Sequence, residues 1–356
     1  MSKVLMKGNE AIGEAAIRAG CLNYFAYPIT PQSEVAEYLS RRMPEVGGVF
    51  LQGESEVAVG YMIFGAAGAG ARVFTTSSSP GISLMSEALS YIASAQCPAV
   101  FVNIMRGGPG LGGILPSQGD YFQATKGGGH GDYRLLVLAP ASVQEAVEMV
   151  MQAFPLAEKY RNPVMILGDG LIGQMMEPVE FPDHLKTEPS NKNAWATNGM
   201  DTRKSNTRNL VKSLFLDPDV LNSHNLELRA KYERMQMEDV QYETFNIDVD
   251  YVALIVSYGT QSRVCRTAIE NLKLEGIEVG MVRPKTLFPF PLIPIREAAS
   301  KVGCRAVMSI EMSMGQMVED VERAVQGRCP VSWYGKCGGD VTTPEEIMET
   351  VRKTIA

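Results

Sequence analysis

The sequence contains few of the residues that usually hold metal ions or iron–sulfur clusters. Its 356 residues include six cysteines and three histidines, and no two cysteines form a Cys-x-x-Cys pair. Structural zinc ions and iron–sulfur clusters are held by closely spaced cysteines and histidines. We therefore expect no metal site in this chain. We expect its cysteines to be buried thiols of a protein from a reducing compartment.

The sequence also lacks an excess of basic residues and any long apolar run. Lys and Arg number 33 against 40 Asp and Glu, which gives a formal net charge of −7. This balance argues against a nucleic-acid partner bound through a broad basic face. No apolar run approaches membrane-spanning length, and the first four residues do not lead into the apolar core of a signal peptide. We expect a cytoplasmic protein with neither a nucleic-acid nor a membrane partner.

Motifs of two common enzyme classes are absent as well. No Gly-x-Ser-x-Gly segment is present, and no glycine-rich segment ends in Gly-Lys-Ser or Gly-Lys-Thr. The first motif presents a catalytic serine, and the second surrounds the phosphates of a nucleotide. The glycine-rich segment 107–113 is therefore weak support for a phosphate site.

The sequence does contain an alternation of short apolar runs with helical patterns, which is typical of an α/β protein of two domains. Continuous apolar strands, separated by helices such as those expected at 81–96 and 142–160, form parallel sheets covered on both faces. Ligands of such sheets bind beyond the carboxyl ends of the strands. Within residues 1–180 the expected strands are 24–27, 49–51, 72–76, 99–104, 135–138 and 163–167.

The pattern changes after residue 180 and resumes at residue 250. Residues 181–249 are polar and weakly patterned, which predicts a linker or surface excursion. One charged helix is expected there at 226–243, as a packing arm between subunits. Residues 250–356 predict a second, smaller α/β domain. Its strands are expected at 251–258, 279–283, 305–310 and 331–334, with helices near 260–275, 291–302, 315–326 and 343–355.

The segment 27–31, Tyr-Pro-Ile-Thr-Pro, joins the first expected strand to a helix. Pro31 suits the first turn of that helix, which makes Thr30 the predicted N-cap. Free backbone N–H groups and the helix dipole at such a turn favour an anion. Two interpretations stay open on these residues alone. Thr30 either caps its helix only, or presents its hydroxyl to a ligand.

Two acidic residues, Glu54 and Glu56, follow the strand at 49–51 and open a helix rich in glycine and alanine. A helix start favours carboxylates, so both can be simple first-turn acids. Small residues are tolerated where a backbone or a ligand must approach closely. A carboxylate buried against an apolar cofactor would have a raised pKa and could hold a proton for acid–base chemistry. The two interpretations are about equally supported.

Other polar side chains follow the next two strands. Thr76 and Ser77 could cap the following helix or contact a polar ligand. Arg106 could bind loop carbonyls, or its guanidinium could bind a carboxylate at the end of the strand. His130 lies in a glycine-rich loop, where a structural role is favoured over a role as general base.

The motifs of this chain occur in a distinctive order, at 7–11, 27–31, 54–56, 76–81, 106–109, 118–120, 128–132, 282–291 and 311–316. Together they resemble the α subunit of the 2-oxoacid:ferredoxin oxidoreductases, and most closely the branched-chain (2-oxoisovalerate) type. The likeness covers nearly the whole chain. Any one motif is weak, but the ordered set is specific. It implies an α/β fold of two thiamine-diphosphate-type domains, pyrimidine-binding at 1–180 and transketolase-C-terminal-like at 250–356.

The resemblance also assigns roles to individual residues. It implies that Glu56 is catalytic and hydrogen-bonds N1′ of the pyrimidine of thiamine diphosphate. Glu56 is preferred to Glu54 because Gly65, nine residues further on, fits the spacing of the family. Thr30 and Arg106 match the positions that bind the carboxylate and carbonyl oxygens of the 2-oxoacid. Further cofactor-binding residues are expected at Tyr27, Pro28, Ile29, Thr76 and Ser77.

The activity implied is oxidative decarboxylation of a 2-oxoacid to acyl-coenzyme A, CO2 and reduced ferredoxin. Alternatives are a member specific for 2-oxoglutarate or aryl oxoacids, and a transketolase- or pyruvate-dehydrogenase-type subunit with another electron acceptor. A regulatory scaffold is disfavoured, because Thr30, Glu56 and Arg106 keep reactive residue types. The sequence does not identify which 2-oxoacid is used.

Partner subunits are expected, because the chain lacks parts that the reaction needs. Without cysteine clusters it cannot hold the iron–sulfur centres that complete the oxidation. We find no convincing Gly-Asp-Gly…Asn motif of thiamine enzymes, which completes an oxygen cage for magnesium, around Gly168-Asp169-Gly170. We therefore expect thiamine diphosphate to be shared with a β subunit that binds the diphosphate and Mg²⁺. Separate γ and ferredoxin-like subunits are expected for coenzyme A and electrons.

Overall fold

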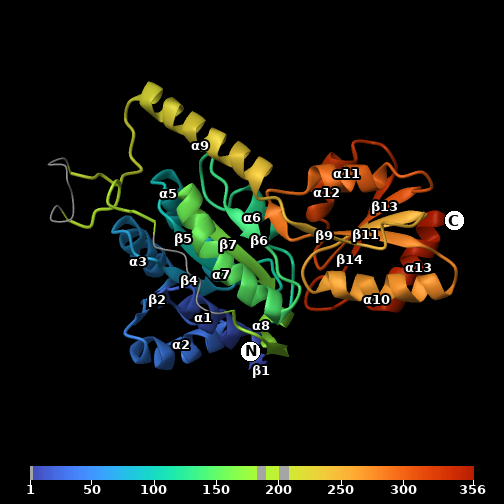
Figure 1. The fold of residues 1–356 in the computed structure, drawn as a ribbon, viewed down its shortest axis with the longest axis horizontal. Helices are drawn as coiled ribbons and strands as arrows, with labels where there is room; N and C mark the ends of the chain where they lie inside the picture. Colours follow the sequence, from blue (N-terminus) through green and yellow to red (C-terminus); the bar gives the residue numbers. More distant parts are fainter. Residues whose placement is uncertain (1–2, 183–189, 200–207) are drawn as a thin grey trace.

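The computed structural model describes residues 3–182, 190–199 and 208–356 (Figure 1). The chain forms two α/β parts, each built on a sheet of its own. We call the part on the seven-stranded sheet domain I and the part on the five-stranded sheet domain II. Figure 1 shows the two side by side, with helix α9 lying along domain I. Part of the polar stretch expected within 181–249 lies outside the described residues.

The sheet of domain I has the strand order β12-β6-β7-β5-β4-β2-β3. Its neighbouring strands are parallel, except that β12 runs antiparallel to β6. Strands β4 to β7 are buried along their whole length, because helices cover both faces of the sheet. The six strands expected in this region are all found. Their bounds are β2 Asn23–Ala26, β3 Val49–Gln52, β4 Phe74–Ser77, β5 Ala99–Met105, β6 Leu136–Leu138 and β7 Pro163–Asp169.

The helices of domain I pack as two groups. Helix α1 contacts α2 and α7, and α3 contacts α4 and α5. The helix expected over 81–96 is interrupted at Met85, so it forms two shorter helices, α4 and α5. A short antiparallel pair, β1 (Val4–Lys7) with β8 (Met176–Val179), was not expected from the sequence. The helices are α1 Gly8–Arg18, α2 Ser33–Glu45, α3 Glu56–Gly68, α4 Ser79–Leu84, α5 Ser86–Ser94, α6 Tyr121–Lys126, α7 Val143–Tyr160 and α8 Gly170–Gln174.

Domain II repeats the pattern on a smaller scale. The strand order is β14-β13-β10-β11-β9, with β9 antiparallel to its neighbour β11. All four strands and all four helices expected after residue 250 are present. The strands are β9 Tyr242–Phe245, β10 Ala253–Val256, β11 Val279–Pro284, β13 Ala306–Glu311 and β14 Val331–Gly335. The helices are α10 Gln261–Leu274, α11 Leu292–Ala299, α12 Met317–Val325 and α13 Pro344–Ile355.

Two strands lie on one side of residue 250 in the sequence but pair in the sheet of the domain formed mainly by the other side. Strand β9 precedes residue 250 but pairs with β11 in domain II. Strand β12 (Thr286–Phe288) follows residue 250 but pairs with β6 in domain I. These pairings tie the domains together by backbone hydrogen bonds. The boundaries expected at residues 180 and 250 stay a prediction.

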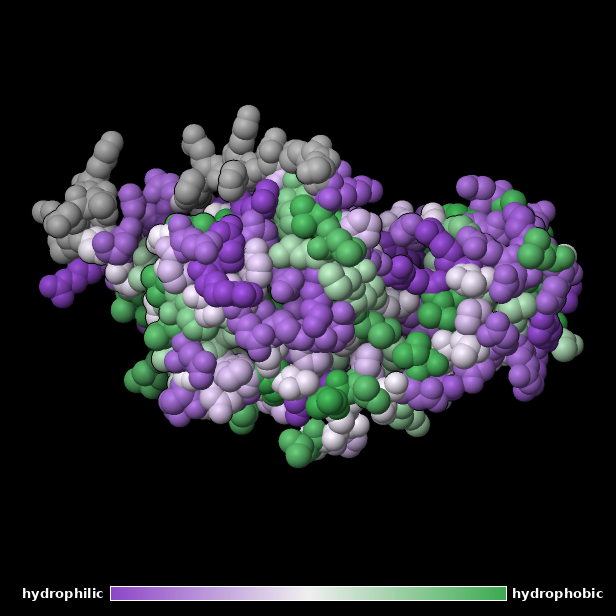
Figure 2. All heavy atoms as spheres, turned by 90° about the horizontal axis from the view of Figure 1, so that it is seen from below, coloured by the Kyte–Doolittle hydropathy of each residue, from purple (hydrophilic) through white to green (hydrophobic). Residues whose placement is uncertain are grey.

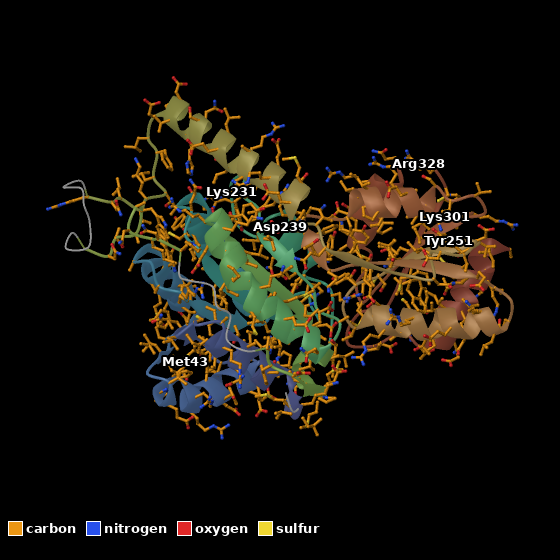
Figure 3. The ribbon with its side chains drawn as sticks, viewed as in Figure 1. Met43, Lys231, Asp239, Tyr251, Lys301 and Arg328 are labelled. Carbon is orange, nitrogen blue, oxygen red and sulfur yellow. The ribbon has the colours of Figure 1, made fainter. Side chains whose placement is uncertain are left out.

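Helix α9 (Pro218–Glu238) begins and ends earlier than the helix expected at 226–243. It begins at Pro218 because the Asp217 side chain accepts from the first free N–H groups of the helix. Its C-terminal end is held on domain I by Asp239, which pairs with Lys159 at 2.7 Å. Figure 3 shows Lys231 and Asp239 on the side of this arm that faces domain I. Lys231 Nζ donates to the Arg161 carbonyl at 3.2 Å.

The seam between the domains is lined by buried polar groups that satisfy one another. Asp169, at the end of β7, accepts from Thr260 N and Oγ1 of domain II at 3.1 and 2.7 Å. Its other oxygen accepts from two backbone N–H groups of α8, and burial raises the pKa of Asp169 against these hydrogen bonds. Asp169 of the Gly-Asp-Gly segment therefore serves the domain contact. The side chain and backbone of Gln118 bond to Tyr258 and Met312.

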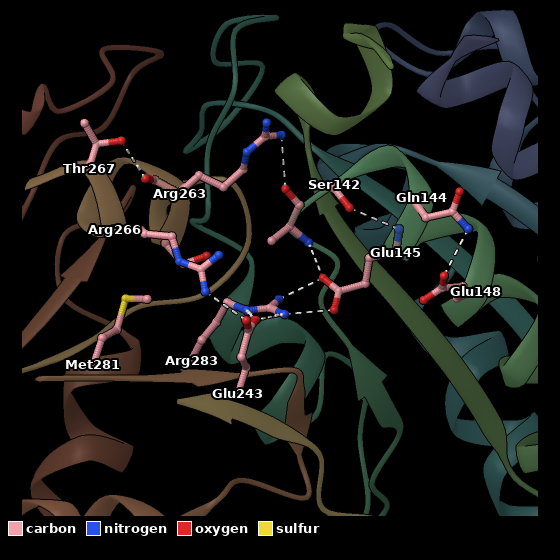
Figure 4. A pocket seen from close by; sticks show the side chains of 12 residues that line it. Ser142, Gln144, Glu145, Glu148, Glu243, Arg263, Arg266, Thr267, Met281 and Arg283 are labelled. Carbon is pink, nitrogen blue, oxygen red and sulfur yellow. Dashed lines mark hydrogen bonds and ion pairs between the residues drawn. The ribbon is translucent and has the colours of Figure 1, made fainter. Parts of the chain in front are cut away.

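An ion-pair cluster completes the seam, around a cavity of about 480 Å³ (Figure 4). Arg283 of β11 donates to both oxygens of Glu145 of α7, each at 2.8 Å, and also pairs with Glu243 of β9. Burial alone would raise the pKa of Glu145, but Arg283, Lys285 and the Ala141 N–H lower it to about 2. The charges lining this cavity are compensated within the chain, so we assign them to the domain contact.

The surface carries polar and apolar residues side by side. Figure 2 shows polar residues over much of the face seen from below, with apolar residues in separate patches. Within the part of the chain that the structure describes, no helix is both long and apolar enough to cross a membrane.

Candidate functional site

The candidate site lies at the edge of domain I where parallel strands end. Strands β2, β4 and β5 are neighbours, so the segments that follow them meet at one edge of the sheet. The segment with Thr30 follows β2, the segment with Ser77 ends β4, and Arg106 follows β5 directly. Helix α3, which begins at Glu56, follows β3 at the same edge. The sheet topology thus brings the four segments predicted from sequence together.

Arg106 and Thr30 are in direct contact, but through a backbone group of Thr30. Arg106 Nη1 donates to the Thr30 carbonyl at 2.9 Å, and Nη2 donates to the Leu111 carbonyl at 3.3 Å. The Arg106 side chain is 7% exposed, and its Nε is buried with no hydrogen-bond partner in the described structure. Both interpretations of this arginine therefore have support. Two of the three guanidinium nitrogens donate to loop carbonyls, and the third, Nε, is buried without a partner in the described structure.

The expectation that Thr30 caps the following helix is wrong. Helix α2 begins at Ser33, its N-cap residue is Gln32, and Pro31 lies outside the first turn. Gln32 instead closes the preceding turn, because its backbone N–H donates to Ile29 at 3.0 Å and its side chain donates to the Tyr27 carbonyl. Thr30 is exposed, as is Pro28, while Tyr27 and Ile29 are half-buried. The turn at 27–30 therefore presents side chains outward from the strand end.

Glu56 is the buried carboxylate of the site. It is the first residue of α3, after the N-cap Ser55, whose hydroxyl accepts from the Ala58 N–H. Glu56 is 7% exposed, whereas Glu54 is exposed and accepts a hydrogen bond from Ser55. No donor to the Glu56 carboxylate is found within the described ranges. The Glu56 oxygens are not among the fully buried atoms of the described residues that lack a partner, so the carboxylate keeps some contact with the surface, from which a ligand can reach it.

The space beside Glu56 depends on a glycine. A side chain at Gly81 of α4 would place its Cβ 2.8 Å from Glu56 Oε1 and 2.1 Å from Ser77 Oγ. Both distances are far below van der Waals contact, so Gly81 leaves room for the two oxygens. Ser77 is 1% exposed and its hydroxyl has no partner in the described structure. An unpaired hydroxyl therefore lies near the unpaired carboxylate of Glu56.

Thr76 differs from its neighbour Ser77. Its hydroxyl donates to Gln32 Oε1 and lies 2.7 Å from the Tyr24 hydroxyl. Both partners belong to the chain, and all three side chains are fully buried. In this structure the Thr76 hydroxyl joins the β4 end to the turn after β2. The Ser77 hydroxyl, by contrast, is buried without a partner in the described structure.

Sequence reasoning gave no role to three polar residues that surround Arg106. Ser79 Oγ accepts from the Arg106 backbone N–H at 3.0 Å and donates to Asp120 Oδ2 at 2.6 Å. Asn103 donates to the same Asp120 oxygen at 2.9 Å and accepts from the Ser79 N–H. Burial raises the pKa of Asp120, while the hydrogen bonds from Ser79 and Asn103 lower it. The motifs at 76–81 and 118–120 contain two of these residues, and were the available signal.

His130 is not part of this cluster. Its ring packs edge-on against Tyr91 of α5, with 6.0 Å between ring centroids, and its carbonyl accepts from Ser90. These contacts support the structural role that the sequence favoured. Among residues 3–182, 190–199 and 208–356, no group of three or more His, Cys, Asp or Glu side chains is arranged to hold a metal ion.

A cavity of about 520 Å³ adjoins the Arg106 loop. It lies between domain I and the loop of domain II around residues 313–316. Asp120 and Ser79 line it, together with the glycine-rich turn 107–110. The end of the loop after Arg106 carries exposed apolar side chains, Leu111, Ile114 and Leu115. The site is thus open on a side that bears apolar residues.

The chain matches two protein-family models in sequence. Residues 14–244 match the thiamine diphosphate-binding domain of pyruvate flavodoxin/ferredoxin oxidoreductases. Residues 251–347 match core domain II of pyruvate:ferredoxin oxidoreductases. The chain belongs to this family. The predicted identification as a 2-oxoacid:ferredoxin oxidoreductase subunit and the predicted two-part thiamine-enzyme fold are confirmed.

Individual relatives agree along nearly the whole chain. The ketoisovalerate oxidoreductase subunit VorB of Methanothermobacter thermautotrophicus is 48% identical over 353 residues, which cover 99% of this chain and 98% of the relative. The 2-oxoglutarate synthase subunit KorA of Archaeoglobus fulgidus is 37% identical over 358 residues, 99% of each chain. The predicted enzyme class, a subunit of an oxidoreductase that acts on 2-oxoacids, is confirmed at this level.

Solved structures give the same fold. A 2-oxoglutarate:ferredoxin oxidoreductase from Magnetococcus marinus, with 2-oxoglutarate, coenzyme A and succinyl-CoA bound, matches with a TM-score of 0.85 at 26% identity. The match covers 100% of this chain and 66% of that longer chain. A split-gene transketolase, an inactive β4 tetramer, matches with a TM-score of 0.61 at 15% identity over 98% of both chains. This second likeness shows the shared fold.

Proposed function

We propose that this chain is the α subunit of a multi-subunit enzyme and supplies one half of a thiamine diphosphate site. The enzyme decarboxylates a 2-oxoacid oxidatively, forming acyl-coenzyme A and CO2 and passing electrons to ferredoxin. The observation that carries the proposal is the Glu56 carboxylate, which is buried, lacks a donor within the described chain, and faces space left by Gly81. Such a group fits the pyrimidine of the cofactor.

Each residue of the site has a part in this proposal. Glu56 holds a proton between its carboxylate and pyrimidine N1′, because a buried carboxyl at this nitrogen exchanges a proton without solvent. Ser77 offers its unpaired buried hydroxyl to the same polar ring. Tyr27, Pro28 and Ile29, in the turn that Gln32 closes, would contact this ring when the cofactor is bound. When bound, thiamine diphosphate supplies the nucleophilic carbon and the electron sink for decarboxylation.

Arg106 and Thr30 bind the 2-oxoacid in this proposal. Arg106 is cationic and buried, and its Nε donor has no partner within the described chain, so a carboxylate oxygen can take that place. The hydrogen bond from Arg106 to the Thr30 carbonyl holds the buried guanidinium beside Thr30, an exposed residue. A cation and a hydroxyl at the same point suit the carboxylate and the oxo group of the substrate.

The other half of the site is proposed to lie on a β subunit, which binds the diphosphate and Mg²⁺. The exposed apolar residues Leu111, Ile114 and Leu115 beside the open site support this division. Iron–sulfur clusters are proposed on a ferredoxin-like subunit and the coenzyme A site on a γ subunit. The six free thiols support a reducing compartment, the cytoplasm, as the location.

Calorimetry with thiamine diphosphate and Mg²⁺ tests the divided site. The isolated chain is expected to bind the cofactor weakly, and the co-expressed complex is expected to bind one cofactor per αβ pair. Tight stoichiometric binding to the isolated chain would refute the division. Ferredoxin or viologen dye, set against NAD⁺, then tests the electron acceptor of the complex. Reduction of NAD⁺ alone would favour a dehydrogenase-type subunit instead.

The branched-chain 2-oxoacids are the proposed substrates. The identity of 48% to a ketoisovalerate oxidoreductase subunit exceeds the 37% to a 2-oxoglutarate synthase subunit, and this difference supports the choice. 2-Oxoglutarate is the second candidate, because relatives with that name span the whole chain. A panel of branched-chain, aryl and dicarboxylic 2-oxoacids, assayed on the intact complex, should give the highest kcat/KM for 2-oxoisovalerate. A higher value for 2-oxoglutarate would reverse the assignment.

A further inference from the structure

We infer that domain II positions Arg106, by a continuous series of hydrogen bonds through Gln316, Asp120 and Ser79. The inference rests on the proposed function for the role of Arg106 as a substrate-binding residue. It gives a role to the motifs at 118–120 and 311–316 and to Ser79, which have no part in the chemistry proposed above. Gln316, Asp120 and Ser79 are in this view positioning residues.

The series begins at a buried carboxylate in domain II. Glu311, at the end of β13, is fully buried and accepts from three backbone N–H groups at the start of α12, at 2.9 to 3.1 Å. One of these donors is the Gln316 N–H, at 3.0 Å. The hydroxyls of Ser309 and Ser313 also donate to the Glu311 oxygens. Five donors to one carboxylate fix the backbone of Gln316 relative to the sheet of domain II.

The Gln316 side chain then crosses to domain I. Its Nε2 donates to the Gly119 carbonyl at 2.7 Å, and its Oε1 accepts from the Phe122 N–H at 2.8 Å. These two backbone groups flank Asp120 in the sequence. Both the NH2 group and the carbonyl of the Gln316 side chain are thus hydrogen-bonded. Together they fix the position and the orientation of the segment around Asp120. Gln118, just before it, bonds to domain II through its backbone and its side chain.

Asp120 passes this constraint to the active-site loop. Its Oδ2 accepts from Ser79 Oγ at 2.6 Å, and Ser79 Oγ accepts from the Arg106 N–H at 3.0 Å. Asn103 binds both Asp120 and Ser79, because its side chain donates to Asp120 and accepts from the Ser79 N–H. The hydrogen bond between a carboxylate and a hydroxyl is short and charge-assisted, so it is stronger than one between neutral groups. The backbone of Arg106 is therefore anchored at the point where β5 ends.

The position of the Arg106 backbone decides where its guanidinium points. Two of its donors bind the carbonyls of Thr30 and Leu111, and Nε is left without a partner in the described structure. Binding groups must be held within about 0.5 Å of their productive geometry. Small backbone shifts at Arg106 would misplace Nε from a substrate oxygen. The series of hydrogen bonds, which begins in domain II, restrains the Arg106 backbone against such shifts.

Chemical modification of the isolated full chain tests positioning without any catalysis. Phenylglyoxal modifies accessible arginines, and mass spectrometry of the Arg106 peptide gives the rate. We expect modification of Arg106 to be at least threefold faster in Ser79→Ala and in Gln316→Ala than in the wild type. Ser223→Ala, which removes an exposed hydroxyl of α9 that donates to the Asp219 carbonyl of the same helix, is expected to match the wild type. Unchanged rates in both test variants would overturn the inference.

Kinetics of the reconstituted complex give the second readout. Loss of one hydrogen bond in the series is expected to raise KM for the 2-oxoacid about tenfold, with kcat within about twofold. Ser79→Thr keeps the hydroxyl and should restore KM. In the double variant Ser79→Ala/Gln316→Ala, the rise should equal the larger single effect, because both residues act through one series. Independent, multiplying effects, or an unrestored KM in Ser79→Thr, would overturn the inference.

The two readouts separate the inference from the proposed function. Faster modification of Arg106 in the variants, without turnover of any 2-oxoacid by the complex, would reject the function and keep the positioning. Turnover with unchanged modification rates and unchanged KM in the variants would keep the function and reject the positioning.

Discussion

Buried polar groups line both the edge of the domain I sheet and the seam between the domains. At the seam these groups have hydrogen-bond partners within the chain, whereas at the sheet edge several of them do not. At the seam, Asp169 accepts four hydrogen bonds, and Glu145 accepts from the Ala141 N–H and from Arg283, all within the chain itself. At the sheet edge, Glu56 has no donor within the described residues, and Ser77 Oγ and Arg106 Nε have no partner there. Buried polar groups that satisfy one another build structure. Unsatisfied buried groups that gather at the ends of neighbouring strands, as here, fit a ligand site.

The difference has a thermodynamic meaning. A buried polar group without a partner costs about 1 to 3 kcal/mol, so the sheet edge is unstable relative to its complex with a ligand. The buried charges and amides that cross the seam are already paired within the chain, so ligand binding would gain no such free energy there. Substitutions at the sheet edge should therefore change binding and catalysis, and substitutions at the seam should change stability. The predictions below separate the two regions on this criterion.

The largest effect is expected at Glu56. Glu56→Gln keeps the shape of the side chain but removes the proton-accepting carboxylate, so kcat of the complex should fall by about 10³-fold, or about 4 kcal/mol. The denaturation midpoint of the chain should stay within about 2 °C of the wild type. The matched control is Glu54→Gln, two residues away and exposed, which should retain activity. Full activity of Glu56→Gln would remove the main mechanistic claim and the contrast between the regions.

At the seam, the largest effect is expected from loss of Arg283. Arg283→Ala leaves Glu145 buried without its bidentate partner, so the free energy of unfolding should fall by about 3 kcal/mol. Urea denaturation followed by circular dichroism measures this loss. Arg266→Ala removes an ion pair to Glu243 on the exposed rim of the same cluster and should cost less than about 1 kcal/mol. Equal losses in both variants would show that burial does not set the strength of the seam.

The sequence located the regions better than it explained their contacts. Strands such as β5 and β7 were predictable because a fully buried parallel strand requires a continuous apolar run. The edge of the sheet was predictable in turn, since parallel strands place their carboxyl ends together. Glu56 and Arg106 could be proposed there from residue type and position. The short pair β1 with β8 was missed, because only Val179 of its eight residues is buried and the pair lacks a buried pattern.

What could not be predicted are contacts that depend on distant parts of the chain. Thr30 meets Arg106 through its carbonyl, which no side-chain motif reveals. Ser79 and Asp120 looked like ordinary polar loop residues, and their bond across 41 positions is visible only after folding. Asp169 was not assigned a cofactor role from the sequence, but its partner, Thr260 of domain II, could not be predicted either. A polar residue type at a strand end is therefore informative about place, but its partner is set by tertiary packing.

A smaller effect at the sheet edge is expected for a conservative change of Arg106. Arg106→Lys keeps the charge but loses the planar fork and the Nε donor, so KM for the 2-oxoacid should rise about thirtyfold, or about 2 kcal/mol. Steady-state kinetics of the complex measure this change. Arg266→Lys, the same substitution on the exposed rim of the seam, should leave KM unchanged. A KM for Arg106→Lys within twofold of the wild type would mean that Arg106 acts only on the loop carbonyls.

The smallest effect expected is a pH dependence that belongs to the seam. The pKa of Glu145 is lowered to about 2 in the folded chain, against an ordinary value near 4.5, because Arg283 and Lys285 outweigh the effect of burial. The ionised form is therefore favoured by folding. This contribution is fully present above about pH 4.5 and is lost as the pH falls from there towards 2.

Glu145→Gln should accordingly be less stable than the wild type at pH 7, and the gap should narrow by about 1 to 2 kcal/mol between pH 5 and pH 2.5. Urea denaturation at a series of pH values measures the gap. Because Glu158 is held near a pKa of about 2 in the same way, by Arg72 and Lys192 against its burial, both proteins should still lose stability in acid. Only the difference between them reports on Glu145. Parallel curves would show that the Glu145 carboxylate contributes through its shape and hydrogen bonds, and that its charge is not what holds the two domains together.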